Sequence, residues 1–164
     1  MEIERKWFVS GWPEHLAAHK VYSMDQGYIS VRPTVRIRRE EEVGAESEYI
    51  LCFKGKGRLS REEIETQIDA ALFSRLETML GCPLIHKERR DYLLSDGHRL
   101  EVNLVDEGLP TSFFYAEIEF ETEEDARSWS PSLCALEAYL TDEVTEKQGV
   151  SMGSYWEKTR HADF

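Results

Sequence analysis

Charged residues recur at every second position in several segments of this sequence, and apolar residues stand between them. In the first segment, Glu2, Glu4 and Lys6 alternate with Ile3. Successive side chains of a β-strand point to opposite faces, so residues two positions apart share a face. Each such segment is therefore predicted to form a strand with one charged face and one apolar face.

Strand signals are more frequent than helix signals along the chain. Eight segments are rich in β-branched and aromatic residues and end at turn residues. They span residues 2–9, 22–30, 34–41, 47–56, 61–68, 84–94, 98–104 and 113–121. Four segments carry start or stop signals of helices. These are 13–20, 69–80, 122–128 and 131–139. The pattern predicts an α+β protein with a mostly antiparallel sheet, and eight strands are enough to close a barrel.

Length and composition set further limits. The 164 residues suit one domain, 1–164, with a single sizeable core. No apolar run is long enough for a transmembrane helix, and the charged start of the chain is unlike a signal peptide. The three cysteines are widely spaced, which indicates free thiols rather than a disulfide framework. These features predict a cytoplasmic protein.

The net charge of −12 bears on the choice of partners. An acidic surface repels nucleic acid and anionic membranes, so neither is an expected partner. A small anionic substrate remains compatible with this charge if the basic residues gather in one place. The sequence is compatible with a monomer and with a homodimer.

The charged faces of the predicted strands divide into acidic, basic and mixed groups. The groups are Glu2, Glu4 and Lys6; Arg36 and Arg38; Lys54 and Lys56; Arg61, Glu63 and Glu65; Lys87 and Arg89; Glu101 and Asn103; and Glu117, Glu119 and Glu121. In one interpretation these faces point to water, as in an ordinary half-buried sheet. A solvent face usually mixes uncharged polar residues with charges, so the full charges favour a second interpretation. In that interpretation they line a water-filled barrel, where pairing or metal binding makes their burial tolerable.

A barrel interior of this kind suits a small triphosphate bound together with a divalent metal. A triphosphate carries about four or five negative charges, and Arg and Lys from several strands hold such a group well. Carboxylate oxygens suit hard ions such as Mg²⁺ or Mn²⁺. A metal neutralises phosphate charge and lowers the pKa of bound water, so no protein nucleophile is required.

A series of short motifs follows along nearly the whole chain. The motifs are Glu2-Ile3-Glu4-Arg5-Lys6, Gln26-Gly27-Tyr28, Val35-Arg36-Ile37-Arg38, Phe53-Lys54-Gly55, Arg61-Glu62-Glu63-Ile64-Glu65, Lys87-Glu88-Arg89, Ala116-Glu117-Ile118-Glu119 and Glu143-Val144-Thr145. In this order they resemble the motifs of the CYTH superfamily, the triphosphate tunnel metalloenzymes. The resemblance implies an eight-stranded antiparallel barrel that forms a tunnel, with a C-terminal helix near one tunnel end.

The resemblance also implies roles for individual residues. The implied phosphate-binding residues are Lys6, Arg36, Arg38, Lys54, Lys87 and Arg89. The implied metal ligands, for Mg²⁺ or Mn²⁺, are Glu65, Glu117 and Glu119. The implied catalytic groups are Glu2, Glu4, Glu63 and Lys87.

Two places depart from the family's pattern. The family often has Asp in the seventh strand, where this chain has Asn103, and an amide is a weaker metal ligand or base than a carboxylate. The family's C-terminal Tyr-x-Asn pattern is replaced by the segment 151–155, Ser-Met-Gly-Ser-Tyr. The roles of Asn103 and of this segment are therefore not given by the resemblance.

The resemblance favours an enzyme that hydrolyses inorganic tripolyphosphate to pyrophosphate and phosphate. The same scaffold hosts thiamine- and nucleoside-triphosphatases and class IV-type adenylyl cyclases, and a fold does not choose among them. A non-catalytic module that binds polyphosphate or nucleotides is a further alternative. The carboxylates among the aligned charges argue against that module, because binding a polyanion requires them only if they hold metal.

Overall fold

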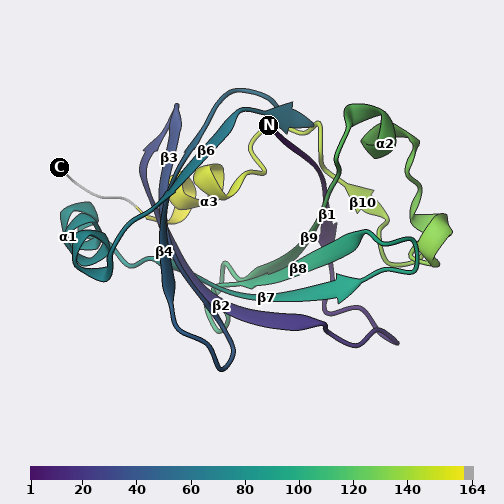
Figure 1. Ribbon diagram of the computed structural model, residues 1–164, viewed down its shortest axis with the longest axis horizontal. Helices are drawn as coiled ribbons and strands as arrows, with labels where there is room; N and C mark the ends of the chain where they lie inside the picture. The colour runs from purple at the N-terminus through teal and green to yellow at the C-terminus, as the bar shows by residue number, and fades with distance from the viewer. Residues whose placement is uncertain (161–164) are drawn as a thin grey trace.

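The computed structural model describes residues 1–160. Residues 161–164, the end of the predicted domain 1–164, lie outside the described part. The described chain forms one antiparallel sheet that curls into a nearly closed barrel, with helices around it (Figure 1). This confirms the predicted fold class.

The sheet has ten strands, because one predicted strand is interrupted and one short strand is added. The strands are β1 (Glu2–Val9), β2 (Lys20–Val31), β3 (Thr34–Glu42), β4 (Glu48–Lys54), β5 (Ser60–Arg61), β6 (Glu63–Gln67), β7 (Ile85–Leu93), β8 (Arg99–Val105), β9 (Phe113–Glu119) and β10 (Asp142–Glu143). Their order is β10-β1-β9-β8-β7-β2-β3-β4-β6, and β5 pairs with β1. Strands β5 and β6 lie on either side of Glu62, where the sequence predicted one continuous strand. Because β6 pairs with β4 and β5 pairs with β1, these two short strands close the ring.

The helices lie outside the sheet or at its mouth (Figure 1). They are α1 (Ala70–Leu80), α2 (Glu123–Ser128) and α3 (Met152–Thr159). The side chain of Asp69 caps α1, and Gly81 ends it in the left-handed region at φ 66°. These boundaries confirm the helices predicted at 69–80 and 122–128. None of the helices between residues 1 and 160 is long and apolar enough to cross a membrane.

Two other predicted helices are wrong. The segment 13–20 has no helix; it turns at His15, whose φ is 66°, and leads directly into β2. The segment 131–139 forms only a short 3₁₀ turn, Pro131–Cys134, because Ala135 takes a left-handed φ of 55°. In both cases a proline start signal was present, but the backbone leaves the helical region before a full helix forms.

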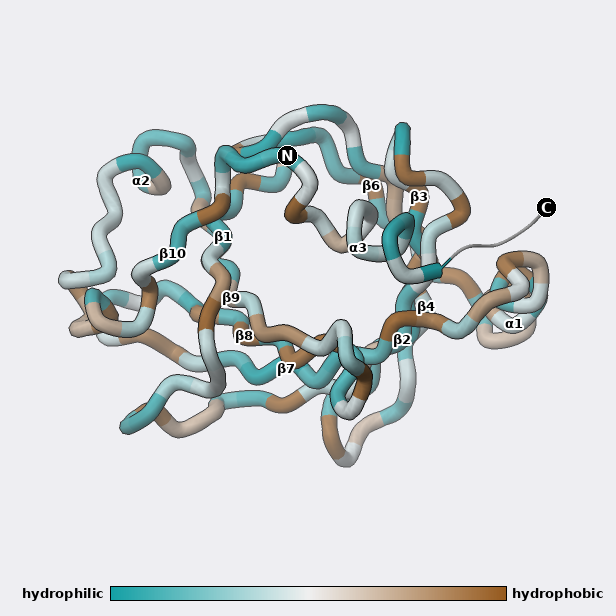
Figure 2. The backbone as a smooth tube through the Cα atoms, turned by 180° about the vertical axis from the view of Figure 1, so that it is seen from behind, coloured by the Kyte–Doolittle hydropathy of each residue, from teal (hydrophilic) through white to brown (hydrophobic). Residues whose placement is uncertain are grey.

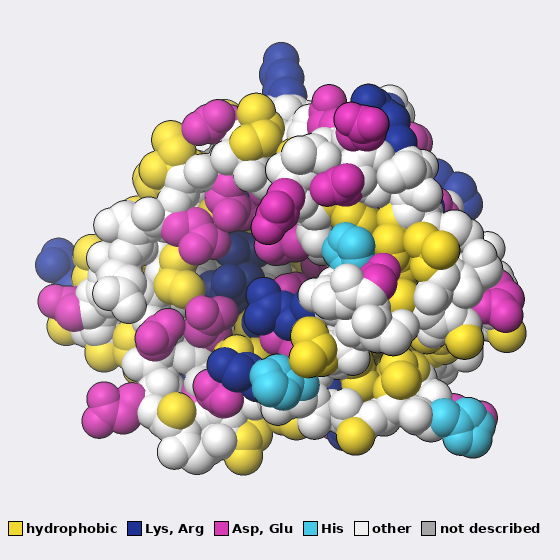
Figure 3. All heavy atoms as spheres, turned by 45° about the vertical axis from the view of Figure 1, so that its right-hand side comes forward, with side chains coloured by type: hydrophobic (Ala, Val, Ile, Leu, Met, Phe, Trp, Pro, Cys, Tyr) yellow, Lys and Arg dark blue, Asp and Glu magenta, His cyan; other side chains and the backbone are white. Residues whose placement is uncertain are grey.

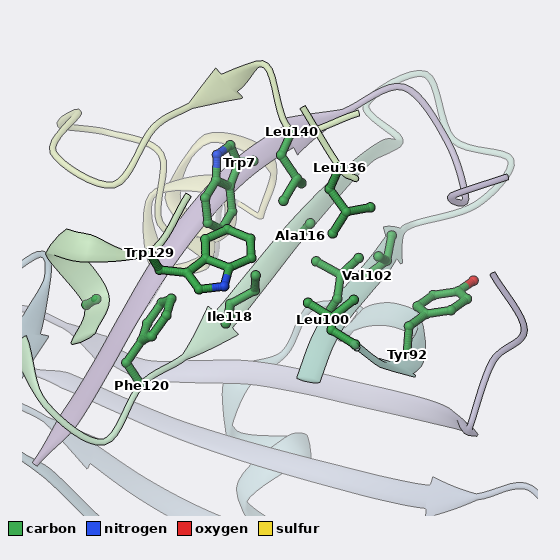
Figure 4. Packing of buried hydrophobic residues seen from close by; sticks show 12 residues of the cluster. Trp7, Tyr92, Leu100, Val102, Ala116, Ile118, Phe120, Trp129, Leu136 and Leu140 are labelled. Carbon is green, nitrogen blue, oxygen red and sulfur yellow. The ribbon is translucent and has the colours of Figure 1, made fainter. Parts of the chain in front are cut away.

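The apolar side chains lie largely on the outer face of the barrel. One cluster packs Trp7, Val102 and Ile118 of the wall against Trp129 and Leu136 (Figure 4). A second cluster lies under α1 and around α3 and includes Ile37, Phe73 and Trp156. Along the strands, hydrophilic and hydrophobic residues alternate around the open centre (Figure 2). The inner face is therefore left to polar and charged groups.

Helix α3 is fastened to the barrel by a buried ionic contact. Arg160 Nη1 lies 2.6 Å from Asp106 Oδ2, and the Tyr155 hydroxyl donates to the same oxygen at 2.6 Å. Gly27 of β2 leaves room for the side chains of Leu84, Leu80 and Trp156, because a Cβ there would lie 2.7, 2.8 and 3.2 Å from them. The C-terminal half of α3 is thereby held against the barrel.

Candidate active site in the barrel tunnel

The barrel encloses a cavity of about 660 Å³. Every residue assigned from the sequence to catalysis, phosphate binding or metal lines it: Glu2, Glu4, Lys6, Arg36, Arg38, Lys54, Glu63, Glu65, Lys87, Arg89, Glu117 and Glu119. Figure 3 shows a recess with Lys and Arg side chains deep inside and Asp and Glu side chains around them. The structure thus brings together residues from six strands, β1, β3, β4, β6, β7 and β9, that are far apart in the sequence.

One acidic group is formed by Glu2 and Glu4 of β1 and Glu119 of β9. One carboxylate oxygen from each lies within 4.8 Å of the other two. Burial and the neighbouring Glu117 and Glu2 raise the pKa of Glu4 well above its ordinary value. Burial, Glu2 and Glu117 likewise raise the pKa of Glu119. Mutually repelling carboxylate oxygens at this spacing fit a divalent cation such as Mg²⁺ or Mn²⁺.

Lys54 lies between this group and a second acidic group, which is formed by Glu63 and Glu65 of β6. Its Nζ lies 3.1 Å from both Glu2 oxygens and 3.3 Å from Glu63 Oε2. Burial disfavours the charged form of Glu2, but Lys54 and Arg61 outweigh it and lower the pKa of Glu2 to about 2. Burial and Glu2 raise the pKa of Glu63 to about 7.

The three carboxylates assigned to metal lie in different surroundings. Glu119 belongs to the group with Glu2 and Glu4, whereas Glu65 has oxygen atoms near Glu63 and the Cys52 thiol. Burial raises the pKa of Glu117, but Lys6, Glu4 and Lys87 outweigh it and keep that pKa below its ordinary value. The assignment of Glu65, Glu117 and Glu119 to metal stays a prediction.

The basic wall is built by β3 and β7, which both flank β2. Arg36 is 7% exposed and Lys87 is 4% exposed. The Nε atoms of Arg36 and Arg38 have no hydrogen-bond partner within residues 1–160. Burial, Arg38 and Arg36 hold the pKa of Lys87 well below its ordinary value. Buried cations with free donors are suited to a polyanion that enters the tunnel.

The start of the C-terminal helix contributes to the tunnel wall, as the resemblance implied. Residues 144, 145 and 147–154 are among the lining residues. Lys6 Nζ donates to the carbonyl oxygen of Val150 at 2.8 Å, and Thr145 Oγ1 accepts from the Lys6 backbone N–H at 3.0 Å. The segment 151–155 that replaces the family's pattern forms the start of α3, where Ser151 is the N-cap.

Several lining residues received no role from the sequence, among them Tyr115 and Glu101. Tyr115 is 2% exposed and accepts a hydrogen bond from Lys87 Nζ at 2.8 Å. It lies two positions before Glu117, so extending the alternation backwards would have found it. Glu101 lies 3.6 Å from Arg89, and burial raises the pKa of Glu101 to about 7 against the opposing effect of Arg89.

The fold and the site define a class of protein: an antiparallel β-barrel with a tunnel lined by acidic and basic groups. The chain belongs to the CYTH domain family, whose model matches residues 1–145. It is 34% identical over 146 residues to an inorganic triphosphatase of Nitrosomonas europaea, covering 88% of this chain and 89% of the relative.

Solved structures resemble the chain in the same way. The crystal structure of an inorganic triphosphatase matches with a TM-score of 0.60 and 25% identity, over 94% of this chain and 93% of that one. A Hippeastrum protein, described as a putative adenylyl cyclase with a dominant triphosphatase activity, matches with a TM-score of 0.65. It is 15% identical and covers 99% of this chain and 98% of its own, so this match shows a shared fold.

Proposed function

We propose that this protein is a divalent-metal-dependent triphosphatase that cleaves inorganic tripolyphosphate to pyrophosphate and phosphate. The tunnel cavity carries the proposal, because both carboxylates and cationic side chains line it. In the ring order, β1 lies opposite β2, and β9 lies opposite β3. The acidic side chains of Glu117 and Glu119 on β9 therefore lie across the tunnel from the basic side chains of Arg36 and Arg38 on β3. The 34% identity to an inorganic triphosphatase supports the same activity.

The lining residues divide the work between binding and chemistry. Arg36, Arg38, Lys54, Lys87, Arg89 and Lys6 bind the phosphate groups. Glu65, Glu117 and Glu119 remain the predicted metal ligands, and the geometry adds Glu2 and Glu4 beside Glu119. A bound Mg²⁺ or Mn²⁺ supplies charge neutralisation and a more acidic water. Glu63, with a pKa of about 7, is suited to exchange a proton near neutral pH.

The setting of the enzyme is proposed from the same observations. Cys52, Cys82 and Cys134 are free thiols, which supports a cytoplasmic location. The acidic net charge supports a small triphosphate rather than nucleic acid or a membrane as the partner. The protein would act as a monomer or as a homodimer.

Phosphate release from three substrates tests the activity. Tripolyphosphate, thiamine triphosphate and ATP are each incubated with the protein in Mg²⁺, in Mn²⁺ and in EDTA. We expect release from tripolyphosphate with metal and none in EDTA. Faster release from thiamine triphosphate or ATP would replace the proposed substrate. Tripolyphosphate binding without release from any substrate would leave a binding module.

Two substitutions separate chemistry from binding. Glu119→Gln removes a carboxylate from the acidic group and should abolish turnover while tripolyphosphate still binds. Arg38→Ala removes a buried phosphate donor and should raise the Kd for tripolyphosphate more than it lowers turnover. Calorimetric binding and turnover are measured for both proteins. The opposite pattern would overturn the assignments of these two residues.

A further inference from the structure

One uncharged side chain in the tunnel has hydrogen-bonding groups that the described protein does not satisfy. Asn103 on β8 is 1% exposed and lines the cavity. Neither its Oδ1 nor its Nδ2 has a hydrogen-bond partner between residues 1 and 160. Most buried side-chain amides are hydrogen-bonded, so this one marks a place where a ligand or water supplies the partner.

The neighbours of Asn103 favour an anionic partner. Its register partners are Arg89 on β7 and Tyr115 on β9, and register partners point to the same face of the sheet. Lys87 Nζ donates to the Tyr115 hydroxyl at 2.8 Å, so the amide lies between the Arg89 guanidinium on one strand and the Tyr115–Lys87 pair on the other side. The amide N–H groups therefore lie where the positive charge of β7 would hold a phosphate.

The neutral charge of Asn103 matters at this place. An amide offers two N–H donors, whereas an ionised carboxylate offers only acceptors and carries a negative charge. A carboxylate beside Arg89 would pair with that guanidinium and repel phosphate. Glu101, two residues away, already lies 3.6 Å from Arg89.

We propose that Asn103 binds the substrate directly, by donating a hydrogen bond from Nδ2 to a non-bridging phosphate oxygen. Together with Lys87 and Arg89 it forms a part of the tunnel that binds polyphosphate without metal. The proposal rests on the proposed function, because it names a further contact of the same site. It assigns a substrate-binding role to the position where the chain departs from the family's usual Asp.

A direct observation of the side chain tests this contact. Asn103 is the only asparagine in the sequence, so labelling with ¹⁵N-asparagine gives one side-chain amide in the NMR spectrum. Tripolyphosphate is titrated in EDTA, so that neither metal binding nor turnover contributes. We expect the two Nδ2 proton signals to shift and to saturate together with the calorimetric binding curve. Saturated binding with unmoved side-chain signals would overturn the proposal.

Substitutions test the energetic role. Asn103→Ala removes the donor, and Asn103→Asp also adds a charge. We expect the Kd for tripolyphosphate in EDTA to rise about tenfold for Ala and up to about a hundredfold for Asp. Gln67→Glu is the matched control, because it makes the same amide-to-carboxylate change at an exposed position outside the lining. Its Kd should stay near that of the unchanged protein.

The outcomes separate this proposal from the proposed function. An unchanged Kd in both Asn103 variants overturns the contact even if tripolyphosphate is hydrolysed. Shifted Nδ2 signals without phosphate release in Mg²⁺ or Mn²⁺ support the contact and remove the hydrolase. Thermal unfolding of each variant verifies folding, and the labelled unchanged protein gives the decisive result if a variant does not fold.

Discussion

The inner and outer faces of one strand show how the barrel separates function from stability. On β1, Glu2, Glu4 and Lys6 line the tunnel, whereas Trp7 lies in the outer apolar cluster and is 1% exposed. Small barrels usually fill their interior with packed side chains. In this barrel the apolar side chains pack on the outer face instead, under α1, α2 and the loop 129–140. The interior is thereby left for a charged ligand.

The two faces also differ in how well their charges are satisfied. Arg5 on the outer face donates to Glu143 at 2.7 Å and to the carbonyl oxygens of Ala126 and Trp129. On the inner face, Arg36 and Arg38 keep Nε atoms without partners in the described chain, and the pKa of Glu4 is raised by burial and like charges. Arg5 on the outer face thus has its partners within the protein, whereas Arg36 and Arg38 on the inner face keep donors for a bound ligand.

Trp7→Ala should produce the largest change, and it should affect stability. Deleting a buried tryptophan leaves a cavity beside Trp129 and costs about 3–5 kcal/mol. Chemical denaturation measures the free energy of unfolding, and turnover is measured per folded molecule. Turnover should persist in the folded fraction. A loss of turnover larger than the loss of folded protein would show that the two faces are not separate.

Glu4→Gln should lower turnover and leave the stability of the fold intact, which is the opposite of the effect of Trp7→Ala. Removing this carboxylate from the acidic group should lower turnover by about 100-fold or more, since a bound metal supplies several kcal/mol of transition-state stabilisation. The metal-free protein should unfold at the same temperature or a higher one, because Glu4 is repelled by Glu117 and Glu2. Turnover assays and thermal unfolding in EDTA test both parts. A strongly lowered Tm would place Glu4 among the stabilising residues.

Asp96 provides an outer-face prediction about acid. Burial opposes its charge, but hydrogen bonds from His98 and from Trp129 Nε1 lower the pKa of Asp96 to about 2. A carboxyl whose pKa is lower in the folded than in the unfolded protein stabilises the fold at pH values above its ordinary pKa near 4. This stabilisation is lost as the pH falls from about 4 through about 2. Because Asp96 is exposed to solvent, screening reduces this contribution to about 1–2 kcal/mol.

Unfolding free energies measured across that acid range test Asp96. Asp96→Asn should lower stability near neutral pH and flatten the dependence on acid. Turnover near neutral pH should be unchanged. An unchanged acid profile in the variant would assign the acid sensitivity to the tunnel carboxylates instead.

Asp69→Ala should have the smallest effect. Asp69 Oδ1 accepts from the Leu72 backbone N–H at 2.7 Å and caps α1 on the outside of the barrel. Loss of such a cap costs about 1 kcal/mol. A small drop in the free energy of unfolding with full turnover is expected. Reduced turnover would indicate that α1 influences the tunnel through the wall.

The sequence predicted the inner face well because strand periodicity fixes which residues share a face. Glu2, Arg36, Lys87 and Glu117 were assigned to one site from spacing and motifs, and all line the cavity. Spacing within a strand does not give the register between strands. The meeting of Glu4 with Glu119 depends on their pairing in the β1–β9 ladder, which the sequence alone does not specify.

Regions without periodicity were predicted less well. The segment 144–154, most of which lines the cavity, is mostly irregular and has no alternation of polar and apolar residues. The position of Val150 beside Lys6 therefore followed only from the three-dimensional fold. The segment 13–20 carried a helix start at Pro13 but lacks a continuous apolar face to pack on the barrel. Local signals predict an element, and tertiary contacts decide whether it forms.

The barrel ring closes at its shortest ladder, and this has a consequence for its motions. Strand β5 meets β1 at Glu2↔Arg61 and Ile3↔Ser60, whereas β1 and β9 are in register from Glu4↔Glu119 to Val9↔Phe114. The short seam is therefore the part of the wall whose amide protons should exchange with solvent soonest. Glu2 lies on the seam and in the acidic group at once. A ligand that engages Glu2 ties the two edges together, so ligand binding should slow exchange at the seam before it does so elsewhere in the barrel.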